Sequence, residues 1–312
     1  MQAKRPEAAA PAAQRAGDLV PVDVRARLRV LEIAPRRARG ARGFGLHASP
    51  SRGAGLEFAQ YRAYEPGDEP RQVDWKLYAR SDRFFVREAE RDSPLDLWLL
   101  VDTSASMSQA DGHRPDWTRL HAARVIAACC IELALRQGDR FGIAGVGGAG
   151  LQVTPLGQGP RHRDRCLLAL HALAPAGRWP DARQLRPLWE VLRPQALVIA
   201  LGDVFDDEAV DLLADLSAAR REVLSIQLLT VGERDFPYRG GQRFRDPETG
   251  AELLGDAARI RDGFLQRFGE ARSALASRLT AAGIRHATYV MDEPPDAPLR
   301  RLFPPGPGLR HA

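Results

Sequence analysis

The apolar segment from Leu95 to Val101 constrains the fold of this chain more than any other stretch. It has the length of a single β-strand, and only Asp96 interrupts its run of Leu, Trp and Val side chains. A near-continuous apolar run of this length predicts a strand buried on both faces, as in the centre of a parallel sheet. The run ends directly at Asp102. Because ligands of open α/β sheets bind at the carboxyl ends of the strands, the residues after Val101 are candidates for a functional site.

Three polar residues at alternating positions follow this predicted strand: Asp102, Ser104 and Ser106. They offer only hard oxygen atoms, which suit Mg²⁺ better than a softer metal ion. A second interpretation is purely structural, since Asp and Ser side chains at a strand-to-helix turn commonly bond nearby backbone amides. The three residues by themselves leave both interpretations open.

Predicted strands and helices alternate along the rest of the chain. Apolar runs predict strands at 141–146, 151–154, 196–201, 223–231 and 286–290, the first two forming a hairpin. Helical periodicity predicts helices at 118–135, 165–173, 185–192, 208–220 and 257–282. Alternation of this kind, joined by right-handed crossovers, predicts an α/β fold with a doubly wound, mostly parallel sheet and helices on both faces.

A second predicted strand also runs directly into an acidic loop. The apolar run 196–201 is followed by Gly202 and Asp203. In the common strand order 3-2-1-4-5, the first and fourth strands are neighbours at the point where the order reverses. The loops after these two strands should therefore share one crevice. The topology predicts a metal site made of Asp102, Ser104, Ser106 and Asp203.

Composition indicates which compartment to expect. The 312 residues are 44% hydrophobic and 27% charged, which fits a folded chain of one large domain or two. No apolar run approaches the roughly 18 residues of a membrane helix, and the first residues lack the apolar core of a signal peptide. We therefore expect a cytoplasmic protein with no membrane span. Cys129, Cys130 and Cys166 lack zinc-binding spacing and are expected to be reduced core residues.

Positive charge is concentrated at the start of the chain. Residues 1–50 hold ten Lys or Arg against four acidic residues, while the whole chain carries a net charge of +5. A basic arm of this kind can contact nucleic acid or anionic lipid. It lacks the interleaved aromatic residues that stack on bases, so no nucleic-acid partner is expected.

Two further segments precede the predicted sheet. Apolar residues at near-helical spacing predict a helix over 22–37. The segment 55–80 is dense in Tyr, Arg and Asp. That density is typical of a binding surface, but it equally fits a small subdomain held together by its own ion pairs.

Four motifs in order resemble one bacterial protein family. They are the segment Gly55–Arg80, the D-x-S-x-S-Met run that starts at Asp102, the Gly-Asp-x-Phe-Asp run at Gly202–Asp206, and the Asp-Pro-Glu-Thr-Gly run at Asp246–Gly250. Together they resemble the domain of unknown function 58 (DUF58) family over roughly residues 19–303. Members of that family are similar to von Willebrand factor A domains and are commonly encoded beside MoxR-type AAA+ ATPases.

This resemblance implies a metal-ion-dependent adhesion site. Asp102, Ser104 and Ser106 match its first loop, and Asp203 matches its last. The middle loop of the family commonly offers a Thr-Asp pair. Here that stretch reads Gly177-Arg178-Trp179-Pro180-Asp181, so the threonine is missing while Asp181 remains. The resemblance therefore implies a weak site for Mg²⁺ or another divalent cation. It also implies a non-enzymatic adaptor or co-chaperone that works with a MoxR-type ATPase.

The predicted domain layout follows from these segments. We expect a disordered tail over 1–18, a helix and Tyr/Arg/Asp-rich subdomain over 19–92, a von Willebrand factor A-like domain over 93–303, and a tail over 304–312. The stretch around the Asp-Pro-Glu-Thr-Gly run predicts a hairpin insertion near 233–256, between the fifth strand and the last long helix.

A Mg²⁺-dependent hydrolase acting on phosphate substrates is the alternative function, because Mg²⁺ beside carboxylates supports phosphoryl chemistry. An aspartyl-phosphate enzyme would need a second carboxylate two residues after Asp102, where Ser104 stands. The sequence has no P-loop and no G-x-S-x-G motif. The pattern therefore favours a binding module over an enzyme.

Overall fold

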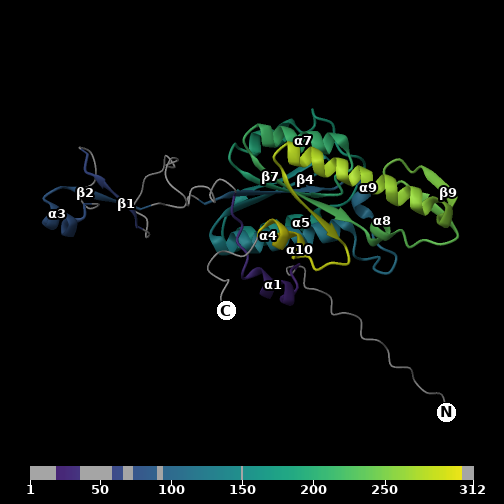
Figure 1. Ribbon diagram of the computed structural model, residues 1–312, viewed down its shortest axis with the longest axis horizontal. Helices are drawn as coiled ribbons and strands as arrows, with labels where there is room; N and C mark the ends of the chain where they lie inside the picture. Colours follow the sequence, from purple (N-terminus) through teal and green to yellow (C-terminus); the bar gives the residue numbers. More distant parts are fainter. Residues whose placement is uncertain (1–18, 36–57, 66–72, 90–93, 149, 304–312) are drawn as a thin grey trace, which may run out of the picture. The chain divides into compact units, whose positions relative to one another are not determined.

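The computed structural model (Figure 1) describes residues 19–35, 58–65, 73–89, 94–148 and 150–303. The chain divides into two compact units. One combines Met1–Pro35 with Leu95–Ala312, and the other is Arg36–Pro94. The predicted tails, 1–18 and 304–312, lie outside the described residues.

Six of the described strands form the central sheet of the larger unit. Across the sheet they are β10 (Arg285–Val290), β7 (Glu222–Leu229), β6 (Leu197–Gly202), β3 (Asp96–Asp102), β4 (Arg140–Gly147) and β5 (Gly150–Gly157). All neighbours are parallel except β4 and β5, which form the predicted antiparallel hairpin. The predicted order is confirmed, because the first and fourth strands of this sheet, β3 and β6, lie side by side.

Helices cover both faces of the sheet, as predicted. One face carries α1 (Val22–Leu28), α4 (Arg119–Gln137), α5 (Pro160–Ala172) and α10 (Ala297–Leu302), and the other carries α6 (Arg186–Val191), α7 (Asp207–Ala218) and α9 (Ala257–Ala281). Figure 1 shows α7 and α9 above the sheet and α1, α4, α5 and α10 below it. Alternate residues of β3 enter the two cores, with Leu97 and Leu99 in one and Trp98 and Leu100 in the other. The fold is therefore α/β and doubly wound.

Capping residues define the longest buried helix, α4. Thr118 precedes it, and its hydroxyl oxygen accepts a hydrogen bond from the backbone N–H of His121 (3.1 Å). Gly138 ends the helix in the left-handed conformation (φ 75°), which a residue without Cβ adopts at little cost. Cys129 and Cys130 lie on its buried face as free thiols, which confirms their expected place in the core.

The predicted helix over 22–37 is shorter in the structure and belongs to the larger unit. It ends at Leu28, and the chain continues to Ile33 without regular structure. The backbone N–H and C=O of Ile33 both bond the side-chain amide of Gln137 in α4, at 2.9 and 3.0 Å. Val24 and Leu28 are buried in the core below the sheet. The predicted 19–92 subdomain is therefore wrong at its start, because the smaller unit begins at Arg36.

The predicted strand over 223–231 ends early. Strand β7 stops at Leu229 because Thr230 caps a short helix, α8 (Val231–Asp235), in a capping box with Glu233. The predicted hairpin insertion follows as β8 (Gly241–Arg245) and β9 (Glu252–Asp256), which pair antiparallel. In Figure 1 this hairpin lies at the end of α9 away from α7.

The smaller unit contains an antiparallel pair, β1 (Phe58–Ala63) and β2 (Phe85–Ala89), and the helix α3 (Trp75–Ser81). Asp74 caps α3, because its Oδ1 accepts hydrogen bonds from the backbone N–H groups of Lys76 and Leu77, both at 3.0 Å. Tyr78 of α3 stacks on Phe84, with ring centroids 4.4 Å apart. Aromatic packing and a helix cap thus hold the described part of this unit.

Candidate functional site

The two acidic strand ends meet at the carboxyl edge of the central sheet. Asp102 is the last residue of β3, and Asp203 follows the last residue of β6. Both side chains are buried, at 5% and 4% exposure. The negative charge of Asp203 is close enough to contribute to a raised pKa of Asp102. The two acidic strand ends are therefore neighbours, as the strand order predicted.

Ser104 and Ser106 complete this group. Their hydroxyl oxygens lie 2.9 Å apart, and both residues are buried. The backbone N–H of Ser104 donates to Oδ1 of Asp102 at 2.8 Å. This is the turn-stabilising bond of the structural interpretation. The bond uses only Oδ1 of Asp102, which leaves Oδ2 for a cation. The structural interpretation and a cation site are therefore compatible.

Gly202 makes room for the Asp102 carboxylate. A Cβ atom at position 202 would lie 2.8 Å from Cβ of Asp102 and 3.0 Å from its Oδ2. Real Cβ atoms essentially never approach side-chain atoms so closely, so any larger residue would displace the carboxylate. Gly202, the last residue of β6, therefore sets how closely the carboxylates of Asp102 and Asp203 can approach each other.

Gly202→Ala is expected to destabilise the protein by about 1–3 kcal/mol, because the new methyl group overpacks a buried contact. Chemical unfolding at neutral pH measures the loss. Gly269→Ala is the matched control. Gly269 lies within α9 with open space around its Cβ position, so alanine there is expected to be neutral or to stabilise by about 0.5–1 kcal/mol. Equal effects at the two positions would contradict the close approach at Gly202.

A buried guanidinium stands beside the acids. Arg119, the first residue of α4, is 1% exposed. Its Nη1 donates to Oδ2 of Asp203 at 3.0 Å and to the carbonyl oxygen of Ser106 at 3.3 Å. Its Nη2 pairs with Glu233 of α8. Sequence reasoning missed this residue. The signal was a cation in the first turn of a helix, where the helix dipole disfavours positive charge unless an acid faces it.

Further bonds tie the surrounding loops together. Asp111 accepts hydrogen bonds from the backbone N–H groups of Val231 (3.0 Å) and Gly232 (2.9 Å) at the start of α8. The side-chain amide of Gln227 donates to the carbonyl oxygen of Asp203 at 3.0 Å. The loops after β3, β6 and β7 are therefore held as one assembly.

The acidic side chains of this assembly have too little positive charge beside them. Burial is the main cause that raises the pKa of Asp102 to about 7, and repulsion by Asp203 is the second. Burial and Asp203 also raise the pKa of Asp206. Arg119 balances Asp203, but its other nitrogen is already paired with Glu233. A group of acids with too little positive charge is a setting that favours a cation.

The donor set fits a hard divalent cation. Asp102, Ser104, Ser106 and Asp203 would present two carboxylates and two hydroxyls, and Mg²⁺ readily keeps water in its remaining positions. Such a cation would neutralise the Asp102 carboxylate. The described residues contain no group of three or more His, Cys, Asp or Glu side chains placed to hold a metal. The fit therefore depends on serine hydroxyls and water.

The middle loop packs against the first loop. The backbone N–H of Ala105 donates to the carbonyl oxygen of Gly177 at 2.8 Å. Trp179 packs against the core above the sheet. Asp181 is exposed, and its Oδ1 accepts hydrogen bonds from the backbone N–H groups of Arg183 and Gln184, both at 2.9 Å. The structure thus gives Asp181 a local capping role.

Val204 adopts a rare backbone conformation beside Asp203. Its φ is +57°, and its side chain is buried at 6% exposure. A β-branched residue in this left-handed region is a genuine outlier that the surrounding packing must impose. Outliers of this kind cluster at functional sites.

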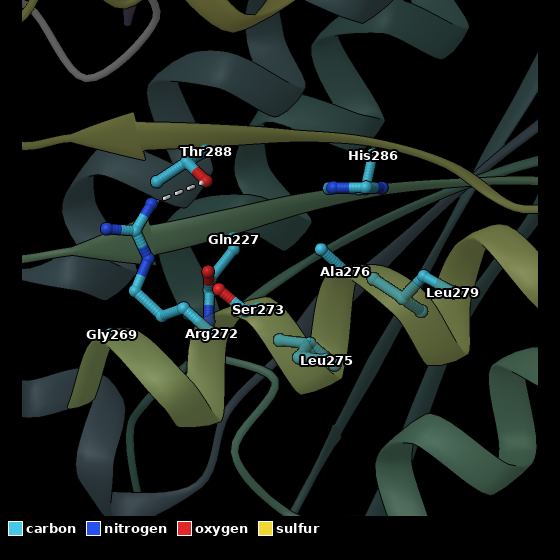
Figure 2. A pocket seen from close by; sticks show the side chains of 9 residues that line it. All are labelled: Gln227, Gly269, Arg272, Ser273, Leu275, Ala276, Leu279, His286 and Thr288. Carbon is cyan, nitrogen blue, oxygen red and sulfur yellow. Dashed lines mark hydrogen bonds between the residues drawn. The ribbon is translucent and has the colours of Figure 1, made fainter. Parts of the chain in front are cut away.

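A separate cavity of about 390 Å³ lies behind this loop, between α9 and the strands β7 and β10. Figure 2 shows Gln227 and Arg272 in its lining, with Arg272 bonded to Thr288 (Nη2 to Oγ1, 3.4 Å). Because Gln227 also bonds Asp203, the cavity adjoins the loop that carries the candidate site.

Uncharacterised proteins of Mycobacterium tuberculosis (strain ATCC 25618 / H37Rv) and Mycobacterium bovis (strain ATCC BAA-935 / AF2122/97) are each 28% identical to this chain over 289 residues, covering 90% of it and 89% of theirs. Among solved structures, the conserved hypothetical protein BatB from Bacteroides thetaiotaomicron is 13% identical, with a TM-score of 0.42 over 66% of this chain and 95% of its own. The SpRpn10 VWA domain is 15% identical, with a TM-score of 0.39 over 67% and 95%.

None of the helices in the described ranges combines the length and the apolar character that a bilayer crossing requires. The model of one protein family, "Protein of unknown function DUF58", matches residues 60–274, which is more than half of the chain and includes both acidic strand ends. The protein therefore belongs to the DUF58 family.

Proposed function

We propose that this protein is a non-enzymatic, metal-dependent protein-interaction module. Asp102, Ser104, Ser106 and Asp203 hold one divalent cation, with Mg²⁺ preferred, and a coordination position stays open for an acidic side chain of a partner. The observation that carries the proposal is a pair of buried carboxylates at neighbouring strand ends. Within the described ranges, only Asp203 of the two has a guanidinium partner. The cation supplies the missing charge and a Lewis-acidic point of attachment.

The proposed partner is a MoxR-type AAA+ ATPase, because relatives in the DUF58 family are commonly encoded beside such enzymes. A partner carboxylate would add both a ligand and a negative charge. Metal and partner affinities should therefore rise together, since linkage makes the coupling reciprocal. The module would act as an adaptor or co-chaperone for the ATPase.

Two linked measurements test this function. If the dissociation constant for Mg²⁺ is about 1 mM, then about 10 mM Mg²⁺ should stabilise the fold by roughly 1.4 kcal/mol. For a unit of this size that corresponds to about 3–5 °C in melting temperature. In parallel, a MoxR-type ATPase should co-purify with the protein in Mg²⁺ but not in EDTA. Asp102→Ala should abolish both effects while leaving the circular dichroism spectrum unchanged.

Two results would contradict the proposal. Identical melting curves in EDTA and in excess Mg²⁺ would argue against an occupied site. Mg²⁺-dependent phosphatase activity that disappears in Asp102→Ala would favour the hydrolase alternative instead. An Asp181→Ala variant serves as the control, because its carboxylate is exposed and engaged in a local turn.

A further inference from the structure

An apolar helix face forms one wall of the cavity between α9 and the strands β7 and β10. Leu275, Ala276 and Leu279 of α9 line it together with Arg272. Residues three, four and seven positions after Arg272 lie on the same face of a helix. At a rise of about 1.5 Å per residue, this face extends for roughly 10 Å from Arg272 to Leu279. An occupant of the cavity therefore meets a cation at one end and aliphatic side chains beyond it.

Arg272 is a half-buried cation without an acidic partner. Its bond to the Thr288 hydroxyl is long (3.4 Å), and its Nε is buried with no hydrogen-bond partner among the described residues. No Asp or Glu is found among the described residues that line the cavity. Figure 2 shows the guanidinium beside Thr288 at one end of the cavity. Because guanidinium groups bind carboxylates through two parallel hydrogen bonds, this end of the cavity fits a carboxylate.

Gln227 adds a hydrogen-bond acceptor to the cavity wall. Its side chain is buried, at 6% exposure, and lines the cavity. Its Nε2 donates to the carbonyl oxygen of Asp203 at 3.0 Å, which fixes the orientation of the amide. Its Oε1 accepts no hydrogen bond from the part of the chain that the structure describes. Since a buried polar side chain is rarely left with an unpaired atom, the cavity favours a ligand that carries an N–H donor as well as an anion.

We propose that the cavity binds an apolar amino acid with a free carboxylate and an acylated amine, as in an N-acyl amino acid or at the C-terminus of a peptide. The carboxylate accepts hydrogen bonds from Arg272, and the amide N–H donates to Oε1 of Gln227. The aliphatic side chain packs on Leu275 and Leu279. A volume of about 390 Å³ accommodates such a ligand, because small-molecule pockets measure roughly 300–1,000 Å³. This site is separate from the proposed cation site and needs no metal.

The experiment is a calorimetric titration of the full chain in EDTA, with N-acetyl-L-leucine as the probe. We expect saturable binding with a Kd of roughly 1 mM, as for other ligands of this size. N-acetyl-L-leucinamide lacks the carboxylate and should bind at least about tenfold more weakly. The ester analogue 2-acetoxy-4-methylpentanoate replaces only the N–H by oxygen and should bind about three- to tenfold more weakly.

Three variants locate the ligand. Arg272→Met removes the cation and should weaken binding of N-acetyl-L-leucine by about ten- to hundredfold. Arg267→Met is the matched control, because Arg267 is exposed on the same helix and does not line the cavity. Ala276→Leu fills the cavity without a change of charge and should abolish binding. Its circular dichroism spectrum should match that of the wild type, which shows that the loss is not unfolding.

A peptide that ends in Ala-Leu with a free carboxylate distinguishes the two sources of this chemistry. If the peptide binds at least as tightly as N-acetyl-L-leucine, the site accepts a chain end, and if it does not, the ligand is a free small molecule. Either result supports the site. Equal binding by Arg272→Met and Arg267→Met, by Ala276→Leu and the wild type, or of the leucinamide and the acid would refute it. The absence of saturable binding to the wild type would show that the cavity holds water only and would overturn the proposal.

Discussion

Arg119→Met is expected to lower the free energy of unfolding by about 3–5 kcal/mol, because it leaves the buried Asp203 and the half-buried Glu233 without their shared cation. The Arg119 guanidinium is almost fully buried and bridges Asp203 and Glu233. Methionine fills much of the same volume but carries no charge, so the loss would report the ion pairs more than packing. For a unit of this size the melting temperature should fall by about 6–20 °C. Denaturant unfolding in EDTA measures the change.

Arg140→Met is the matched control for this effect. Arg140 forms a two-bond contact with Asp96, in which both distances are 2.7 Å, but its side chain is 45% exposed. Exposed pairs of this kind contribute about 1 kcal/mol or less. If the two variants lost equal stability, burial would not be the source of the Arg119 effect. Added Mg²⁺ should restore more stability to Arg119→Met than to the wild type, because Asp203 then lacks its permanent cation.

In the metal-free protein, the contribution of Asp102 to stability is expected to fall as the pH rises from about 4 to about 7. Asp102 has a pKa of about 7 in the folded protein, against an ordinary value of 3.8, so the folded state holds this proton more tightly than the unfolded state. Between the two values, raising the pH therefore favours unfolding. The total loss is at most roughly 4 kcal/mol, and stability should level off above the folded pKa.

Asp102→Asn isolates this contribution. The variant cannot ionise at this position, so its stability relative to the wild type should grow with pH up to about 7 and then stay constant. Unfolding free energies measured in EDTA from pH 4.5 to 8.5 test the trend. Mg²⁺ should remove most of the wild-type loss at high pH, because the cation favours the ionised carboxylate. Parallel curves for the two proteins would show that Asp102 is not the group responsible.

The position of the site could be predicted from sequence because it depends on few and general rules. The apolar runs before Asp102 and Asp203 indicate buried strands whatever the surrounding structure. The strand order of doubly wound sheets then brings their ends together. Neither step requires knowledge of an individual side-chain contact, so the adjacency of the two acids followed from the chain alone.

The partners of these acids could not be predicted in the same way. Arg119 is 84 residues from Asp203 and 114 from Glu233 in sequence, and no periodic pattern links positions so far apart. Periodicity likewise showed that Val24 and Leu28 would be buried, but not against which unit. Pattern rules identify buried faces and strand ends, whereas long-range pairing is settled by tertiary packing.

The backbone at Val204 has a consequence for how readily the Asp203 loop can rearrange. A residue in this region costs about 1–3 kcal/mol, and the cost is borne by the resting conformation alone. An alternative loop conformation in which Val204 has an ordinary φ would not carry this strain energy. The free-energy difference between the observed loop conformation and such an alternative is smaller by that amount. A ligand can select a minor conformation that lies within a few kcal/mol of the main one. The strain at Val204 therefore lowers the free energy needed to rearrange the loop that carries Asp203.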